Sequence, residues 1–134
     1  MKSQIFINLP VKDLTKAMDF YTKIGFTNNP QFTDETAACM FISDEIFVML
    51  LTHPKFKEFI KKEISDTAKT TEVINSLSVG SIAKMNEMAD AAINAGAQEP
   101  TEPKDYGFME QRSFSDLDGH HWEVFYMDMS KFPQ

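Results

Sequence analysis

Apolar and polar residues follow one another in a recurring order in the first part of this chain. Residues 4–9 alternate as in a strand, and Asp13 precedes apolar positions at helical spacing that stop at Gly25. Three strand patterns then follow, at residues 26–33, 37–43 and 46–52. We expect Pro10 to end the first strand, which gives the order βαβββ.

The same order returns in the second part of the chain. A strand pattern covers residues 73–79, Ser81 can cap a helix, and Gly96 lies where that helix should stop. Three more strands are predicted, at residues 97–99, 109–115 and 120–127, with a loop at 100–107 before the second of them. The sequence therefore predicts an α+β protein of two βαβββ modules, neither of which covers its own sheet completely.

The segment between the two modules has a different pattern. Residues 54–64 place Phe56, Phe59 and Ile60 on one side of a predicted helix and lysines elsewhere, and residues 66–71 are polar. A connector helix with a solvated lysine face is the simpler interpretation, and a lid over a pocket is the alternative. We expect residues 1–134 to form a single domain, with module 1–53, connector helix and loop 54–71, and module 72–134.

Composition narrows the function classes. The chain has 13 basic and 20 acidic residues and a net charge of −7, which argues against nucleic acid or an anionic membrane as a partner. The single cysteine, Cys39, excludes an internal disulfide and is expected to be an inert buried thiol. Because no signal peptide or membrane-spanning stretch is evident, we expect a cytoplasmic protein without a membrane partner.

The stretch from Ser113 to Tyr126 concentrates the candidate chemistry. Asp118 and Gly119 predict a tight turn, and alternation after it places His121, Glu123 and Phe125 on one face of a strand. A carboxylate among apolar side chains must be compensated by a metal, a proton or hydrogen bonds. Glu123 is thus a candidate general base or ligand acceptor, or alternatively a carboxylate satisfied by a nearby hydroxyl or by Arg112.

Together these motifs resemble the vicinal oxygen chelate superfamily, which includes glyoxalases, bleomycin resistance proteins and extradiol dioxygenases. Residues 9–14, Leu-Pro-Val-Lys-Asp-Leu, followed by Phe20 and Tyr21, are similar to the family's first helix entry. Residues 116–123 resemble its Asp-Pro-Asp-Gly-x-x-x-Glu motif, with Leu117 in place of proline. The resemblance implies the glyoxalase-like fold, in which two modules form a curved mixed sheet around a cup-shaped cavity.

The resemblance also implies where a metal would bind. Metal-dependent members carry ligands on the first and last strands of each module, and these positions fall on Phe6, near Leu50, near Ile74 and on Glu123. Of these four side chains, Glu123 alone has a donor that a divalent cation could use. We therefore expect no tightly held metal and no other cofactor.

Alternation also predicts which residues line the ligand face. His121 and Glu123 are the candidate catalytic residues. The candidate ligand-binding residues are Phe6, Asn8, Val48, Leu50, Ile74, Ser76, Ser78 and Phe125. Ordinary core packing is the alternative for the apolar members of this group.

We therefore expect a protein similar to glyoxalases and bleomycin resistance proteins that binds a small organic molecule without the usual family metal. The alternative is a metal-dependent lyase or dioxygenase in which His121, Glu123 and a relocated third donor hold the metal. Asp105, Tyr106 and His53 are the candidates for that third donor. A regulatory or antidote-type protein remains a third, non-catalytic alternative, and the resemblance implies a homodimer.

Overall fold

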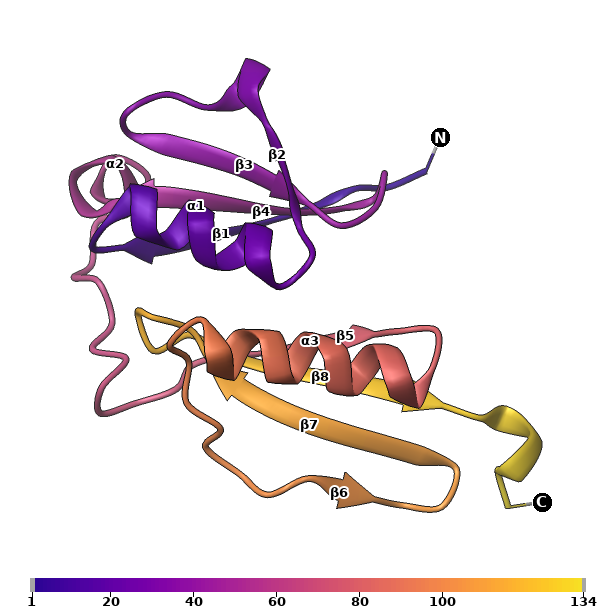
Figure 1. Cartoon of the computed structure of the whole chain (residues 1–134). Coiled ribbons are helices and arrows are strands. Elements are labelled where there is room, and N and C mark those ends of the chain that lie inside the picture. The colour runs from indigo at the N-terminus through magenta and orange to yellow at the C-terminus, as the bar shows by residue number, and fades with distance from the viewer. Residues whose placement is uncertain (1, 134) are drawn as a thin grey trace. The chain divides into compact units, whose positions relative to one another are not determined.

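The computed structural model describes residues 2–133, and it divides the chain into two compact units. These units are residues 1–66 and residues 67–134. In both units a helix lies along one face of a four-stranded mixed sheet (Figure 1). The prediction of an α+β fold with two βαβββ-like modules is confirmed.

The first unit contains a sheet of order β1-β4-β3-β2. Its elements are β1 (Ile5–Val11), α1 (Leu14–Lys23), β2 (Thr27–Asn29), a 3-10 turn (Pro30–Phe32), β3 (Ala37–Phe41), β4 (Ile46–Thr52) and α2 (His53–Lys57). β1 runs parallel to β4, and the other neighbours are antiparallel. Pro10 lies within β1 instead of ending it, because an outer strand tolerates a residue without an N–H group.

Helix α1 covers one face of this first sheet. Asp13 caps the helix by accepting a hydrogen bond from the backbone N–H of Lys16 at 3.1 Å, as predicted. The helix buries Ala17, Phe20 and Tyr21. Removing such apolar side chains from water stabilises the unit by about 1.5–3 kcal/mol for each large residue. The core of this unit therefore lies between α1 and the sheet.

The second unit repeats this arrangement with a sheet of order β5-β8-β7-β6. Its elements are β5 (Ile74–Ser78), α3 (Ile82–Asn94), β6 (Lys104–Asp105), β7 (Met109–Ser115), β8 (His121–Met127) and a 3-10 turn (Met129–Lys131). β5 runs parallel to β8, and β7 is antiparallel to both β8 and β6. The predicted strand at residues 97–99 is wrong, since only Gln98 forms a bridge there, with Ser115.

Helix α3 covers one face of the second sheet. Ser81 caps it by accepting a hydrogen bond from the N–H of Lys84 at 3.0 Å, as predicted. Met85 and Ala89 pack against Val124 of β8 in a buried cluster. Every odd-numbered residue of β8 consequently lies on the face that α3 does not cover.

The segment after β4 differs from its predicted form. The helix expected at 54–64 is limited to α2, which ends at Lys57, and Phe59 is 69% exposed. Helical spacing without a surface to pack against does not offset the cost of ordering the chain. None of the helices in residues 2–133 is long and apolar enough to cross a membrane.

Candidate functional site

The turn between β7 and β8 orients the strand that carries the candidate residues. The side chain of Asp116 accepts hydrogen bonds from the N–H groups of Asp118 and His120, at 3.0 and 2.9 Å. Gly119, at a φ of 87°, donates its N–H to the carbonyl of Asp116 at 3.0 Å. The left-handed conformation at Gly119 closes the turn, so the strand restarts at His121 in a fixed register.

The register confirms the predicted alternation in this unit. His121, Glu123 and Phe125 pair with Ile74, Ser76 and Ser78 of β5, respectively, and these six residues share one face. Trp122 and Val124 are buried on the opposite face, which α3 covers. We call the first surface the Glu123 face. It comprises Ile74, Ser76 and Ser78 of β5, Lys104 of β6, Gln111, Ser113 and Ser115 of β7, and His121, Glu123 and Phe125 of β8.

The carboxylate of Glu123 is held by neutral side chains. The hydroxyl of Ser76 donates to one carboxylate oxygen at 3.3 Å, and the amide of Gln111 donates to the other at 3.5 Å. Both contacts are long for hydrogen bonds to a charged acceptor, which are usually 2.7–2.9 Å. The carboxylate therefore retains capacity to accept a stronger donor.

Arg112 does not contact Glu123, because it lies on the opposite face of β7. Its guanidinium group bonds both carboxylate oxygens of Glu99, at 3.0 and 3.1 Å. It also donates to Asp90 at 2.8 Å and to Asn86 at 3.2 Å, both on α3. Hydrogen bonding to Glu99 is the main cause that raises the pKa of Arg112. Of the two partners predicted for Glu123, the hydroxyl is present and Arg112 is not.

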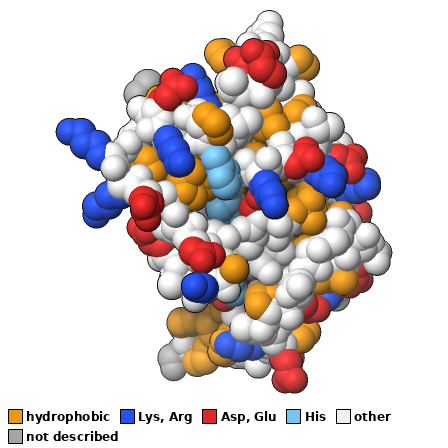
Figure 2. Space-filling view, turned by 90° about the vertical axis from the view of Figure 1, so that its left-hand side faces the viewer, with side chains coloured by type: hydrophobic (Ala, Val, Ile, Leu, Met, Phe, Trp, Pro, Cys, Tyr) orange, Lys and Arg blue, Asp and Glu red, His pale blue; other side chains and the backbone are white. Residues whose placement is uncertain are grey.

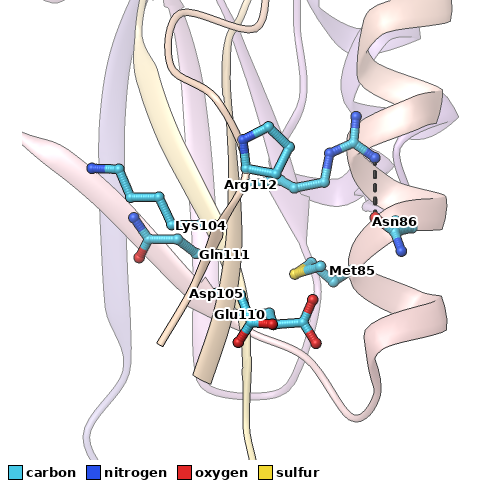
Figure 3. A pocket seen from close by; sticks show the side chains of 8 residues that line it. Met85, Asn86, Lys104, Asp105, Glu110, Gln111 and Arg112 are labelled. Carbon is cyan, nitrogen blue, oxygen red and sulfur yellow. Dashed lines mark hydrogen bonds between the residues drawn. The ribbon is translucent and has the colours of Figure 1, made fainter. Parts of the chain in front are cut away.

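A hollow of about 200 Å³ lies beside these contacts, between α3 and strands β6 and β7. Figure 3 shows Met85, Asn86 and Arg112 on one side of the strands, with Lys104 and Gln111 pointing to the other side. Asp105 and Glu110 pair across β6 and β7, on the helix side of the sheet. Asp105 therefore faces away from Glu123 and does not supply a third donor beside it.

In the first unit, the register separates residues that were predicted to share a face. Phe6 pairs with Phe47, and the two rings stack with their centroids 4.4 Å apart. Val48 and Leu50 instead pair with Ile7 and Leu9, on the face that α1 covers, and both are fully buried. The placement of Val48 and Leu50 beside Phe6 and Asn8 is wrong, and these two residues belong to the core.

The side chains at the family's metal positions do not fit a metal. Phe6, Leu50 and Ile74 have no donor atom, and Leu50 is buried under α1. The residue paired with Glu123 on β5 is Ser76, since Ile74 pairs with His121. Within residues 2–133, no group of three or more His, Cys, Asp or Glu side chains is placed to hold a metal ion. The described residues thus lack the donor set that a divalent cation requires.

Gln111 is the site residue that sequence reasoning missed. A hairpin closed by Asp118 and Gly119 pairs Ser113 with Glu123 and Gln111 with Phe125. The signal was therefore present in the turn, since counting back from it along β7 places Gln111 on the Glu123 face. Ser113 lies on that face too, but it is buried and its hydroxyl is 2.6 Å from that of Thr101.

The arrangement of two four-stranded sheets, each covered by a helix, has counterparts among known proteins. Residues 4–43 match the family model described as bleomycin resistance protein-like N-terminal. A comparison with curated protein sequences gave no match.

Solved structures with this fold cover nearly the whole chain. A hypothetical protein from Staphylococcus aureus, SA1046, is 25% identical with a TM-score of 0.78, over 94% of this chain and 95% of that one. A glyoxalase/bleomycin resistance protein/dioxygenase family enzyme from Burkholderia phytofirmans is 14% identical, with a TM-score of 0.76 over 94% and 99% of the two chains. A bleomycin resistance determinant encoded on transposon Tn5 is 19% identical, with a TM-score of 0.65 over 95% and 99%. The chain therefore shares the fold of these structures, and its residues 4–43 are similar to the bleomycin resistance protein-like N-terminal family.

Proposed function

We propose that this protein binds a small organic molecule against the Glu123 face and that binding does not require the metal of its superfamily. The observation that carries the proposal is the environment of Glu123. This residue is the one family ligand position with a donor atom, and Ser76 and Gln111 hold its carboxylate. A carboxylate whose partners are neutral and distant keeps acceptor capacity that a donor group of a ligand can use directly.

The composition of the Glu123 face supports the proposal. It combines an aromatic ring, Phe125, with the hydroxyl of Ser76, the amide of Gln111 and the imidazole of His121. Ligand sites typically join apolar surface to a few polar groups that fix orientation. In this role Ile74 and Phe125 supply apolar contact, and Ser76, Ser78, His121 and Glu123 supply polar contacts. Phe6 and Asn8 are proposed to contribute from the exposed face of the first sheet.

The test is a titration followed by backbone amide NMR shifts and by calorimetry. Bleomycin is one probe, because a relative of the same fold is a bleomycin resistance determinant, and a panel of small drug-like molecules is the second. Each titration is run with EDTA and again with added zinc. We expect a ligand that shifts amides of β5, β7 and β8 equally well in both conditions and binds at least about tenfold more weakly to Glu123→Gln.

The matched control is Glu110→Gln, which removes a carboxylate from the helix side of the same sheet. It should leave the affinity unchanged. The proposal fails if binding appears only with zinc. It also fails if the purified protein holds a stoichiometric divalent metal that is lost in both Glu123→Ala and His121→Ala, since that result supports the metal-dependent lyase or dioxygenase.

The proposal includes a homodimer. Large apolar side chains are exposed on or next to the outer strand of each sheet, with Ile5 on β1 and Val73 beside β5 more than half exposed. Exposed apolar edges of this kind are commonly covered by a partner. Light scattering should give twice the 15.3 kDa chain mass. The measurement is made at about 100 µM, where an obligate dimer stays paired. A monomer under these conditions would contradict the proposed homodimer.

A further inference from the structure

We infer that the ligand of the Glu123 face is an organic cation, such as an amine, whose charged group bonds the Glu123 carboxylate. This inference rests on the proposed function and adds the chemical class of the ligand. Three observations support it: the donors that contact the Glu123 carboxylate are neutral, no cationic side chain forms an ion pair with it, and the unit that carries it has a net negative charge.

The first argument is local. The positions that share this face on β5, β7 and β8 contain no lysine or arginine. The two donors to the carboxylate are uncharged and long, at 3.3 and 3.5 Å, so they do not neutralise it. A cationic partner at hydrogen-bond distance strongly stabilises the charged form of a buried or half-buried carboxylate.

The second argument concerns the cations of the same unit. Its one arginine, Arg112, lies on the opposite face and is bonded to Glu99, Asp90 and Asn86. Lys104 pairs with Gln111 and so shares the Glu123 face, but it lies on β6, two strands away from β8. No ion pair found in the described residues involves Glu123. Among the described residues, Glu123 therefore has neutral hydrogen-bond donors and no ion-pair partner.

The third argument is the distribution of charge along the chain. Residues 67–134 contain 5 basic and 11 acidic side chains, a net charge of −6, whereas residues 1–66 contain 8 and 9, a net charge of −1. The surplus of negative charge thus belongs to the unit that carries Glu123, and it attracts cations and repels anions. On the face shown in Figure 2 basic and acidic side chains are interspersed, so the surplus does not form a uniform acidic surface there.

Phe125 supplies the remaining part of the recognition. It follows Glu123 by two residues on the same face of β8. An aromatic ring attracts a cation through its negative face and also packs against apolar groups of a ligand. The expected ligand thus has a charged nitrogen attached to an apolar or aromatic body.

The experiment uses three probes of similar size and different charge: benzylamine, which is cationic at pH 7, neutral benzyl alcohol, and anionic benzoate. Each is titrated into the full chain while backbone amide shifts of β5, β7 and β8 are recorded. We expect benzylamine to bind about tenfold more tightly than benzyl alcohol and benzoate to bind most weakly. Raising the salt from about 20 to 200 mM should reduce the difference, because exposed charges are screened.

The matched variants locate the effect. Glu123→Gln should remove the preference for the amine while leaving benzyl alcohol binding in place, and Glu110→Gln should leave the preference intact. If the three probes shift these amides with equal affinity, or if benzoate binds best, the cation inference is overturned while the proposed function stands. If none of them shifts these amides and the drug-like panel does not either, both fail.

Discussion

The hydroxyl of Thr67 donates a hydrogen bond to the backbone carbonyl of Asp118, in the turn that precedes β8. This contact joins the first residue of the second unit to the turn that sets the register of Glu123. A Cβ atom at Gly119 would lie 2.7 Å from the Thr67 hydroxyl oxygen and 3.2 Å from its backbone oxygen. Gly119 therefore satisfies both the turn conformation and the close approach of Thr67.

Substituting Gly119 with alanine should consequently lower the free energy of unfolding by about 2 kcal/mol, from the strained φ and the clash together. Gly107→Ala is the control, because Gly107 has a similar φ of 86° and open space around its Cβ position. It should cost only about 1 kcal/mol, since it carries backbone strain alone. Urea unfolding measures both, and equal losses would show that the Thr67 contact does not restrict the turn.

The ion pair of Arg112 with Glu99 should be a major contribution to the stability of the second unit. The Arg112 side chain is 13% exposed and that of Glu99 is 26% exposed. Arg112→Met leaves Glu99 without its counter-ion and should lower the free energy of unfolding by about 3 kcal/mol. Asp90, at 64% exposure, is the solvent-exposed partner, and Asp90→Asn should cost less than about 1 kcal/mol. Comparable losses in the two variants would contradict this ranking.

Asn75 should be replaceable by an apolar residue with a gain in stability. Its side-chain nitrogen is buried and has no hydrogen-bond partner among the described residues. Asn75→Leu removes this unsatisfied donor beside Trp122 and should raise the free energy of unfolding by about 1 kcal/mol. Asn86→Leu is the matched control, and it should be destabilising because the Asn86 amide accepts a hydrogen bond from Arg112. Thermal unfolding of the two variants provides the comparison.

Asp34 should titrate below the ordinary range for an aspartate. The hydroxyl of Thr36 and its N–H both donate to Asp34 at 2.7 Å, and these bonds lower the pKa of the carboxyl group. Because the folded pKa lies below the unfolded one, the stabilisation is present above about pH 4 and is lost as the pH falls through the folded value. Thr36→Val removes the hydroxyl and keeps the N–H, so it should move the pKa partly back up in an NMR titration, and an unchanged value would show that the Thr36 hydroxyl does not cause the shift.

The faces of β8 could be predicted from sequence, and those of β4 could not. In β8 the turn at Asp118 and Gly119 fixes where the strand starts, and polar residues alternate with buried ones from His121 onward. Residues 46–51 of β4 are all apolar, so no alternation shows which of them α1 covers. The incorrect placement of Val48 and Leu50 follows from this uniform pattern. The pairing of Phe6 with Phe47 became evident only from the register.

The ends of the helices could likewise be predicted in some places and not in others. Asp13 and Ser81 were predicted as caps because their side chains can accept a hydrogen bond from the N–H group three residues later, and the structure shows both bonds. The segment at 54–64 had the spacing of an amphipathic helix but no capping residue at its end, and the helix stops at Lys57. The contact of Ser76 with Glu123 depended on the pairing of β5 with β8, which short-range patterns do not specify, whereas Gln111 could be placed by counting back from the turn.

Arg112 also makes the second unit accessible to a simple kinetic measurement, because it is the one arginine in the sequence. An arginine-specific protease has a single target bond here, between Arg112 and Ser113 in the middle of β7. Since the guanidinium group is engaged on one face and Ser113 is buried on the other, the bond becomes cleavable only when β7 separates from the sheet. The rate of that one cleavage therefore reports how often the strand beside Glu123 opens, and a bound ligand should slow it.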